Sequence, residues 1–206
     1  MNSRKPIIYI VDDDLSVCRA LTLLLKSHGF SVQTFTRAAE FLVFKRLLLP
    51  SCLVLDIQLP DMNGLLLQET MERRGIHIPI IFITGHGDIP MSVKGMKAGA
   101  VDFLIKPFTK QKLLDAITQA ISKDRIQIKE QAEISKIKRR IQTLSPRELE
   151  VFRLVAKGML SKQIARKLGT VLQTVKIHRS RMMQKMQART VTELTRFAQK
   201  AEIVFS

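Results

Sequence analysis

Short apolar runs separated by longer stretches of helical period dominate the first 121 residues. Runs that are apolar throughout and rich in β-branched residues are typical of buried parallel strands. They lie near residues 7–11, 31–35, 52–56, 79–83 and 101–105. The stretches between them predict helices, with start, cap or stop signals at Gly29, Thr36, Gly64, Pro90, Gly99 and Thr109. This alternation predicts a doubly wound α/β domain, with a five-stranded parallel sheet and helices on both faces.

Polar residues stand at the carboxyl ends of the predicted strands. They are Asp12 and Asp13 after the first run, Asp56 at the end of the third, Thr84 at the end of the fourth and Lys106 after the fifth. Sheets of this type place their chemistry beyond the carboxyl ends of the strands. We therefore expect these polar groups to converge on one pocket.

The residue types in this pocket indicate its chemistry. Three carboxylates, those of Asp12, Asp13 and Asp56, would repel one another without a cation, which predicts a hard divalent ion with Mg²⁺ as first choice. If Asp56 attacks a phosphoryl group, the Lys106 ammonium pairs with a phosphoryl oxygen and the Thr84 hydroxyl adds a hydrogen bond. Each residue alone is as well explained as a helix cap or an exposed side chain. Their joint occurrence at strand ends favours the pocket.

The pattern changes in residues 122–143, which are highly charged and contain no Gly or Pro. Ile134, Ile137, Ile141 and Leu144 keep a helical spacing, so the segment is predicted to be a helical linker. A short coiled coil is an alternative, although it would require a longer run of heptads.

The remaining residues, 144–206, carry start and stop signals for four short helices. The signals are the Ser145-Pro-Arg-Glu148 capping box, Gly158, Ser161, Gly169, and the capping boxes Thr170–Gln173 and Thr190–Glu193. A short turn between the two middle helices is typical of a helix-turn-helix. The predicted organisation is an α/β domain over 1–121, a linker over 122–143 and a small all-α four-helix domain over 144–206.

Charge differs sharply between the two halves of the chain. Residues 1–124 contain 15 Lys and Arg against 12 Asp and Glu, net +3, and residues 125–206 contain 19 against 6, net +13, which together give the +16 of the chain. A basic C-terminal region indicates a nucleic-acid partner. A solvated surface without a ligand would have the same charge.

Two classes of protein are disfavoured by what the sequence lacks. Cys18 and Cys52 do not have the CxxC spacing of a zinc or redox site. The N-terminal apolar run stops after Val11 at three aspartates, too soon for a signal peptide, and no window is suited to span a membrane. We therefore expect a cytoplasmic protein with no membrane partner.

Residues 1 to about 121, with these polar groups at the strand ends, resemble the receiver domain of two-component response regulators, which has the flavodoxin-like doubly wound fold. The resemblance implies that Asp56 is the phospho-acceptor, and that Asp12 and Asp13 hold Mg²⁺ together with it. It also implies that Thr84 and Lys106 contact the phosphoryl group.

Further positions take a role from the same resemblance. Phe103 is the aromatic residue whose rotamer reports the activation state, and the Lys106–Pro107 peptide bond is cis. Gly85, being small, keeps the site open to a histidine-kinase donor. Gln58 and His86 are the positions that tune the lifetime of the phosphoryl group. A general-base role for His86 is an alternative, but a lone loop histidine is more often a surface residue.

The third of the four C-terminal helices has two distinct faces. At about 100° per residue, Val175, Met182 and Met186 fall on one stripe, which is predicted to be buried. The opposite face carries Gln173, Lys176, Ile177, Ser180, Arg181 and Gln184. Lys and Arg can donate to guanine, Gln can read adenine, and an apolar side chain can contact a thymine methyl. Ile177 would by itself be equally well explained as an isolated surface hydrophobe.

Residues 145–202 resemble the LuxR-type helix-turn-helix, so that almost the whole chain resembles the FixJ/NarL class of regulators. The match rests on Leu144-Ser-Pro-Arg-Glu-Leu-Glu-Val-Phe, Ala156-Lys-Gly, Lys162-Gln-Ile-Ala, Leu168-Gly and Thr174-Val-Lys-Ile-His-Arg. The resemblance puts base contacts at Lys176 and Ile177, whereas Ser180 stands where the family can carry a longer basic side chain. Phosphate contacts are expected from Lys162, Thr174, Arg179 and Lys185.

The turn before this helix departs from the family pattern. The family usually has an apolar residue followed by Ser, whereas this chain has Thr170 and Val171. A cap by Thr170 would start the helix one residue early. A weakened domain is the alternative.

The expected function is that of a phosphorylation-controlled transcription factor. A sensor histidine kinase phosphorylates Asp56, and the C-terminal domain binds double-stranded promoter DNA, with RNA polymerase as a further partner. By resemblance, phosphorylation favours one of two arrangements of the surface around helix 4, strand 5 and helix 5, and this surface then either joins two receivers in a homodimer or frees the DNA-binding domain. The protein is not a conventional enzyme, since the receiver takes part only in phosphoryl transfer to its own Asp56 and its hydrolysis.

Two other classes of function compete with this prediction. A phosphatase with an aspartate nucleophile, of the haloacid dehalogenase type, would want a second acid two residues after the nucleophile, where Gln58 stands. A module whose helix-turn-helix docks on RNA polymerase or another regulator is the second alternative. The net charge of +13 in residues 125–206 argues against it, and a steep salt dependence of binding would distinguish DNA from protein as the partner.

Overall fold

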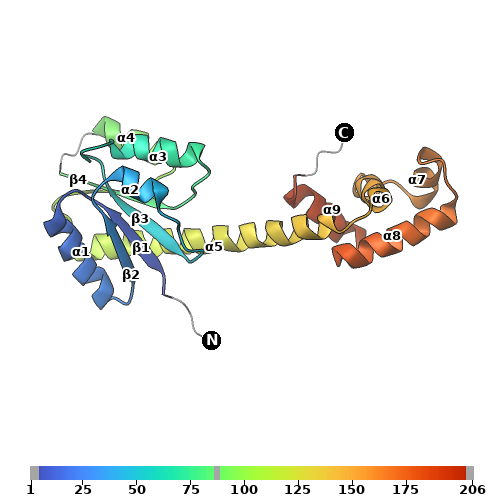
Figure 1. The fold of residues 1–206 in the computed structure, drawn as a ribbon, viewed down its shortest axis with the longest axis horizontal. Coiled ribbons are helices and arrows are strands. Elements are labelled where there is room, and N and C mark those ends of the chain that lie inside the picture. Colours follow the sequence, from blue (N-terminus) through green and yellow to red (C-terminus); the bar gives the residue numbers. More distant parts are fainter. Residues whose placement is uncertain (1–4, 86–88, 203–206) are drawn as a thin grey trace. The chain divides into compact units, whose positions relative to one another are not determined.

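The computed structural model describes residues 5–85 and 89–202 of the chain. It divides into two compact units, Met1–Ile128 and Lys129–Ser206, and the boundary falls within the helix α5 (Lys110–Gln142). Figure 1 labels the helices and strands. Across the described ranges, no helix combines the length and apolarity that a membrane crossing requires.

The first unit is built on a parallel sheet of five strands in the order β2-β1-β3-β4-β5. The strands are β1 (Ile7–Val11), β2 (Ser31–Phe35), β3 (Ser51–Asp56), β4 (Ile80–Thr84) and β5 (Asp102–Ile105). Every residue of β1, β3 and β4 is buried, because helices cover both faces of the central strands. The predicted doubly wound fold is confirmed, and the strand bounds differ from the predicted ones by one residue at most.

Two layers of helices cover the sheet (Figure 1). Ile8 and Ile10 of β1 belong to a core with residues of α1 (Leu15–Ser27) and α5. Tyr9 and Val11 belong to the opposite core, which contains residues of α2 (Ala38–Val43) and α3 (Gly64–Arg73), with α4 (Ile89–Lys97) contributing a partly buried methionine. This alternation follows from the pleat, which turns successive side chains of a strand to opposite faces.

The start of α2 differs from the prediction. Thr36 does not cap this helix; the N-cap is Arg37, which makes no side-chain capping bond. The free amides at the helix start are instead bound by Asp61, whose carboxylate accepts hydrogen bonds from Ala38 N (3.1 Å) and Ala39 N (2.9 Å). A carboxylate at a helix N-terminus satisfies otherwise unpaired N–H groups and is favoured by the helix dipole. Asp61 therefore does from another loop what Thr36 was expected to do locally.

Helix α5 also differs from the prediction. The predicted fifth helix and the predicted linker form one continuous helix, Lys110–Gln142. Its N-terminal signal is correct, since Thr109 Oγ1 accepts a hydrogen bond from Lys112 N at 3.3 Å. The first part of the helix contributes Ile117 and Ile121 to the core of the first unit. Ile137, from the segment predicted as linker, is buried in the core of the second unit.

The second unit contains the four predicted short helices: α6 (Pro146–Ala156), α7 (Ser161–Lys167), α8 (Leu172–Met186) and α9 (Val191–Lys200). The capping box of α6 is complete, with Ser145 and Glu148 each binding the backbone N–H of the other. At α9, Thr190 accepts from Glu193 N at 3.1 Å, but the Glu193 carboxylate binds Arg189 N. The small all-α domain predicted from these signals is confirmed.

The start of α8 is a correction. Thr170 does not cap this helix, and no early start occurs: the N-cap is Val171, without a side-chain hydrogen bond, and the helix begins at Leu172. The Thr170 N–H completes the preceding turn by donating to Ala165 O at 3.0 Å. The cap position of the helix is thus occupied by an apolar side chain that is 66% exposed.

Candidate functional site

The predicted polar residues meet at the carboxyl edge of the sheet. Asp12 follows β1, Asp56 and Thr84 are the last residues of β3 and β4, and Lys106 follows β5. The sheet register aligns these ends, since Asp56 lies opposite Ile83 of the neighbouring strand. Parallel strands in register bring their ends to one edge. The first unit therefore gathers these polar side chains from segments that are far apart in the chain, and we call this group the acidic pocket.

One ammonium group joins two of the carboxylates. Lys106 Nζ donates to Asp12 Oδ2 at 2.9 Å and to Asp56 Oδ2 at 3.0 Å. The Asp12 side chain is fully buried, that of Asp56 is 11% exposed, and that of Lys106 is 25% exposed. Charge-assisted hydrogen bonds of this length are among the stronger polar contacts in proteins. Lys106 thus partly compensates the acidic charge of the pocket.

Burial and pairing act in opposite directions on the ionisation of these groups. Burial raises the pKa of Asp12, and the hydrogen bonds from Lys106 and from the Asp14 N–H only partly oppose this. Burial also disfavours the Lys106 ammonium, but its bonds to Asp12 and Asp56 outweigh that effect and raise its pKa. The Lys106 ammonium is therefore held charged by its two partners.

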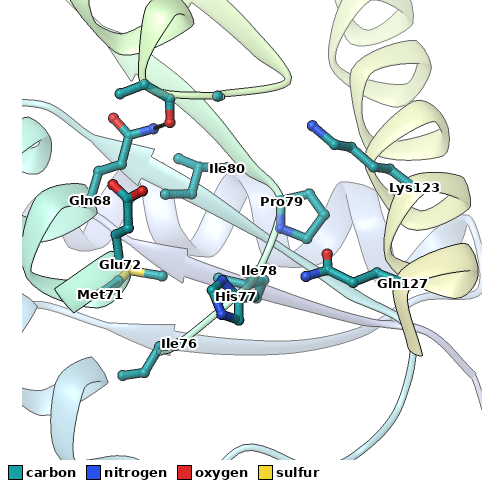
Figure 2. A pocket seen from close by; sticks show the side chains of 12 residues that line it. Gln68, Met71, Glu72, Ile76, His77, Ile78, Pro79, Ile80, Lys123 and Gln127 are labelled. Atoms are coloured by element: carbon teal, nitrogen blue, oxygen red, sulfur yellow. Dashed lines mark hydrogen bonds between the residues drawn. The ribbon is translucent and has the colours of Figure 1, made fainter. Parts of the chain in front are cut away.

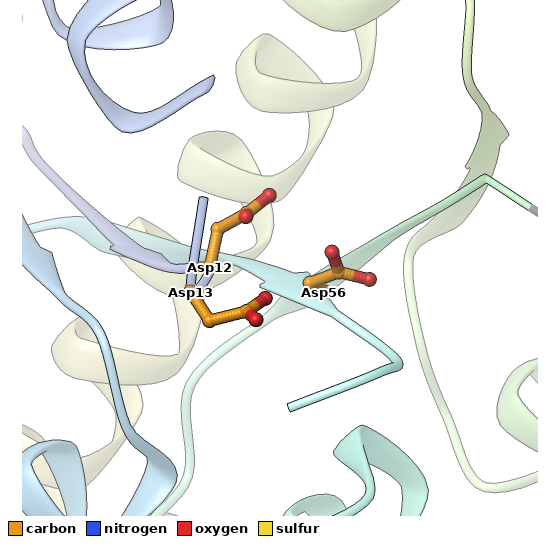
Figure 3. A group of neighbouring side chains, drawn as sticks. All are labelled: Asp12, Asp13 and Asp56. Carbon is orange, nitrogen blue, oxygen red and sulfur yellow. The ribbon is translucent and has the colours of Figure 1, made fainter. Parts of the chain in front are cut away.

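The carboxylates of Asp12, Asp13 and Asp56 form a group that can hold a cation (Figure 3). One oxygen of each lies within 4.8 Å of the others, and two oxygens bound to one Mg²⁺ at about 2.1 Å are at most roughly 4.2 Å apart. Small changes in the side-chain torsion angles would thus bring the three oxygens to the spacing that one Mg²⁺ requires. The carboxylates of Asp12 and Asp56 also accept hydrogen bonds from the backbone, with Asp14 N donating to Asp12 Oδ1 at 2.9 Å and Gln58 N to Asp56 Oδ1 at 3.2 Å. These bonds fix the orientation of both carboxylates.

The remaining pocket residues named from the sequence take the following places. Thr84 is buried, with 2% of its surface exposed, and Phe103 is half-buried with its ring centroid 6.1 Å from that of Phe82. The Lys106–Pro107 bond is cis, as the resemblance implied. Gly85 is exposed, and a Cβ there would have no atom within 4 Å. His86 lies outside the described residues.

Two further residues border the pocket and were not assigned to it from the sequence. A Cβ at Gly64 would lie only 2.6 Å from the backbone oxygen of Asp56, so α3 starts directly against the end of β3. The sequence signal was the isolated glycine, interpreted only as a helix start. Cys18 Sγ donates to Asp12 O at 3.3 Å, and burial raises the pKa of this thiol to about 11. Cys18 is therefore a protonated packing residue rather than a reactive thiolate.

In the second unit, α8 shows the two faces predicted for it. Val175, Met182 and Met186 have no exposed surface and lie in the core with residues of α6 and α9. The residues of the opposite face are all exposed: Gln173, Lys176, Ile177, Ser180, Arg181 and Gln184. This face combines basic side chains that can donate to guanine, glutamine amides that can pair with adenine, and an apolar side chain that can contact a thymine methyl group. It is therefore a chemically suitable reading surface for a DNA groove.

The residues expected to bind phosphates are not equivalent. Lys162 is exposed and Thr174 is half-buried. Arg179 Nη1 donates to Ser161 Oγ at 3.3 Å. Lys185 Nζ binds Glu148 Oε2 at 2.6 Å and Thr143 O at 3.1 Å. Because its ammonium is held by a carboxylate of the same unit, Lys185 has a structural role that the sequence did not suggest.

Comparison with known families gives two matches within the chain. Residues 8–118 match the response regulator receiver domain, and residues 142–198 match the bacterial regulatory proteins of the luxR family. The chain belongs to the two-component response regulators. Both matched parts are regulatory or DNA-binding modules, so the family is one of regulators rather than conventional enzymes.

Several curated proteins resemble this chain over most of their length. Nodulation protein W of Bradyrhizobium diazoefficiens is 49% identical over 197 residues, which cover 96% of this chain and 87% of that protein. Response regulator protein TmoT of Ectopseudomonas mendocina is 44% identical, with 97% and 91% of the two chains covered. Transcriptional regulatory protein FixJ of Bradyrhizobium diazoefficiens is 39% identical, with 94% and 95% covered.

Solved structures give the same family. The response regulator StyR superposes with a TM-score of 0.82 at 43% identity, covering 96% of this chain and 100% of that one. Full-length FixJ from B. japonicum gives a TM-score of 0.56 at 37% identity, with 96% and 98% covered. This response regulator therefore pairs a receiver with a LuxR-type helix-turn-helix domain, the architecture of a phosphorylation-controlled transcription factor.

Proposed function

We propose that this response regulator accepts a phosphoryl group on Asp56 from a sensor histidine kinase and thereby controls the binding of α8 to promoter DNA. The observation that supports this most directly is the pair of hydrogen bonds from Lys106 Nζ to Asp12 (2.9 Å) and Asp56 (3.0 Å). A nucleophilic carboxylate, a second acid and a fixed cation at the edge of a parallel sheet are the parts that phosphoryl transfer to an aspartate needs.

The chemistry assigned to each side chain follows from its type. A carboxylate oxygen of Asp56 attacks the phosphorus atom, the P–N bond to the kinase histidine breaks, and its electron pair returns to the imidazole. The Lys106 ammonium exchanges its contact with Asp56 for one with a phosphoryl oxygen, and the Thr84 hydroxyl donates to another. Hydrolysis later returns the Asp56 carboxylate.

We assign Asp12, Asp13 and Asp56 as the residues that hold Mg²⁺. The support is the carboxylate group described above, in which one oxygen of each residue lies within 4.8 Å of the others. When bound, Mg²⁺ neutralises charge shared between the carboxylates and the phosphoryl oxygens. The fully buried Asp12 and the exposed Asp13 give this group an inner and a solvent-facing ligand.

The phosphoryl group is proposed to bias the surface formed by α4, β5 and α5. Inward movement of Thr84 would leave space that Phe103, already half-buried against Phe82, can fill. The same surface exposes Val93 and Met96 of α4 (45% each) and Ile105 of β5 (53%). Exposed apolar side chains on one surface support a homodimer that forms on phosphorylation.

The proposed DNA contacts are divided by chemistry. Base readers are Lys176 and Ile177, with Gln173, Ser180 and Arg181 beside them on the exposed face of α8. Lys162, Thr174 and Arg179 contribute phosphate contacts. We assign Lys185 first to its bond with Glu148 and only second to phosphate binding.

The domain organisation that goes with this function is a receiver over residues 1–121, a linker over 122–143 and a DNA-binding domain over 144–206. The family matches at 8–118 and 142–198 support it. A promoter-bound regulator meets RNA polymerase, which we propose as a further partner. The proposed location is the cytoplasm, where kinase, chromosome and polymerase are all accessible.

The test is enrichment of genomic DNA fragments on the purified protein with Mg²⁺, with and without beryllofluoride as a mimic of the aspartyl-phosphate. Asp56→Ala removes the acceptor, and Asp115→Ala, an exposed aspartate on α5, serves as the matched control. We expect specific fragments only with treated wild type and treated Asp115→Ala. Equal enrichment in every sample would overturn phosphorylation control, and no enrichment in any would favour docking to a protein instead of DNA.

A further inference from the structure

The last part of α5 within the first unit has little apolar contact with the sheet. Ile121 is the final residue of this helix in the sheet core. Among residues 122–128, all of which the structure describes, only Asp124 is buried, at 2% exposure, whereas Ile126 is 60% exposed. A helix segment without a buried apolar face is not positioned by hydrophobic packing. The position of this segment therefore depends on polar contacts.

Asp124 makes those contacts with the start of β3. Its Oδ2 accepts hydrogen bonds from Ser51 N at 2.7 Å and from Ser51 Oγ at 3.3 Å, across 73 positions of the sequence. Arg46 completes the group, with Nη2 donating to Ser51 Oγ at 2.9 Å and Nη1 to His77 O at 2.8 Å. Burial raises the pKa of Asp124, while the Ser51 amide and the Arg46 guanidinium oppose this. A buried carboxylate kept in place by these donors is a specific contact.

On another side the same helical segment lines a pocket. A cavity of about 170 Å³ is lined by Lys123 and Gln127 of α5, and also by His77 and Pro79 from the loop before β4. Figure 2 shows Lys123 and Gln127 on their helix across the opening from Pro79 and His77. The side chains that line this pocket are not closely packed against one another, so packing does not hold the helical segment in place on this side. This increases the importance of the Asp124–Ser51 contact.

The partner of Asp124 is the strand that carries the phospho-acceptor. Ser51 is the first residue of β3 and Asp56 is the last, and all six residues of this strand are buried. The strand is paired on both sides, with β1 and with β4. A short strand fixed on both edges is a rigid element. The acceptor and the contact to α5 therefore lie at opposite ends of one rigid strand.

We propose that Asp124 is a positioning residue that ties the linker part of α5 to the amino end of the acceptor strand, and that this tie determines how strongly phosphorylation changes DNA binding. The inference rests on the proposed function, since it assumes control of DNA binding through Asp56. Without the tie, residues 122–128 keep only their intrahelical hydrogen bonds. Their position then no longer follows the state of the receiver, and the coupling free energy between the two sites falls.

The experiment compares wild type with Asp124→Ala and Asp124→Asn in the full-length protein. Asp124→Asn retains an oxygen that can accept from Ser51 N but lacks the charge. Asp115→Ala is the matched control, because Asp115 lies on the same helix and is exposed. The measurements are phosphorylation of Asp56 by acetyl phosphate, hydrogen exchange of the amides of residues 122–128, and the ratio of specific DNA affinities with and without beryllofluoride.

For Asp124→Ala we expect phosphorylation close to the wild-type rate, faster exchange in residues 122–128, and an affinity ratio reduced about fivefold or more. The exchange rates and the affinity ratio of Asp124→Asn should lie between those of Asp124→Ala and wild type. If Asp124→Ala does not fold, Asp124→Asn is the variant used for the test. An unchanged affinity ratio in a folded Asp124 variant would overturn the proposal, as would equal effects of Asp115→Ala. If wild type shows no response to beryllofluoride, the proposed function fails instead, and unchanged exchange in Asp124→Ala would then overturn the tie as well.

Discussion

The acidic pocket and the exposed face of α8 are both polar surfaces, but they are assembled in different ways. Asp12, Asp56 and Lys106 come from three segments, and one ammonium binds two carboxylates that are 94 and 50 positions away in the chain. The reading face belongs to one helix, where every residue position follows from the helical period. One surface depends on tertiary contacts and the other on local geometry.

This difference determines how each surface should respond to substitution. In the pocket Asp12 and Asp56 are both bonded to Lys106, so that removal of Lys106 leaves the buried Asp12 without its cation. On α8 the exposed side chains project separately into solvent, and the helix is held by the buried stripe of Val175, Met182 and Met186. Pocket substitutions should therefore affect stability as well as chemistry, whereas face substitutions should affect binding alone.

The largest effect is expected for Lys106→Met, which removes the cation from the buried Asp12. Breaking a buried ion pair from one side typically costs about 3–5 kcal/mol. Because the Lys106 side chain is 25% exposed, we expect a loss of about 2–4 kcal/mol in the unfolding free energy of the first unit. Mg²⁺ should restore part of it, since a cation then faces the carboxylates again.

Urea unfolding followed by tyrosine fluorescence measures this change in the first unit alone, because Tyr9 is the one tyrosine of a chain without tryptophan. Lys112→Met, at an exposed position of α5, is the control. Similar unfolding midpoints for the two variants would contradict the view of the pocket as an interdependent group.

Substitutions of the proposed DNA contacts on α7 and α8 are expected to have smaller effects, and these effects concern DNA affinity instead of stability. Lys176→Ala should cost about 1–3 kcal/mol on the preferred sequence and relax the choice of base at one position. Lys162→Ala should weaken binding uniformly across sequences and reduce the salt slope by about 1. Binding titrations on sequence variants at several salt concentrations separate the two. A uniform loss for Lys176→Ala would remove it from the base readers.

Val171→Ser tests the uncapped start of α8. A serine at this position can accept a hydrogen bond from an N–H group of the first turn, so we expect the second unit to gain about 1 kcal/mol. The matched control is Ile177→Ser, an exposed apolar position in the helix interior where no cap forms. Thermal unfolding of both variants, followed by circular dichroism, gives the comparison. An equal gain for Ile177→Ser would mean that the stabilisation comes from replacing an exposed apolar side chain and not from a helix cap.

The smallest effect concerns the pH dependence of the second unit. Lys185 and the Ser145 N–H hold the pKa of Glu148 below its ordinary value of 4.5. A depressed folded pKa means that Glu148 contributes stability above pH 4.5, which is lost as the pH falls through the folded pKa. Glu148→Gln should make the decline of stability below about pH 4.5 shallower. Glu150→Gln, in an exposed pair with Arg147, should leave that decline as it is in wild type.

Elements buried on both faces could be predicted from the sequence almost to the residue. The strand runs were recognisable because a parallel strand covered by two helix layers must be apolar throughout. The pocket followed from them, since residues such as Asp56 and Thr84 immediately end such runs. The family match of residues 8–118 agrees with that interpretation. In α8, the stripe of Val175, Met182 and Met186 followed from the helical period alone.

Contacts between distant polar side chains could not be predicted in the same way. Thr36 and Thr170 were expected to cap helices from the adjacent position, but α2 is capped by Asp61, 23 positions away, and α8 by no side chain at all. Lys185 was expected to bind phosphate, yet Glu148, 37 positions away, holds its ammonium. Local sequence gives the residues able to make a hydrogen bond, and only the folded backbone brings the partner within reach.

Three features could be predicted from the order of residues: which segments are buried, which helix face is exposed and which residue types gather at the sheet edge. All three depend on hydrophobic periodicity, a property of neighbouring residues. Two other features became visible only in the folded protein: α5 runs unbroken from Lys110 to Gln142, and Asp124 binds Ser51. A hydrogen bond requires two groups to lie about 3 Å apart at a suitable angle, and the chain supplies that geometry only after it has folded.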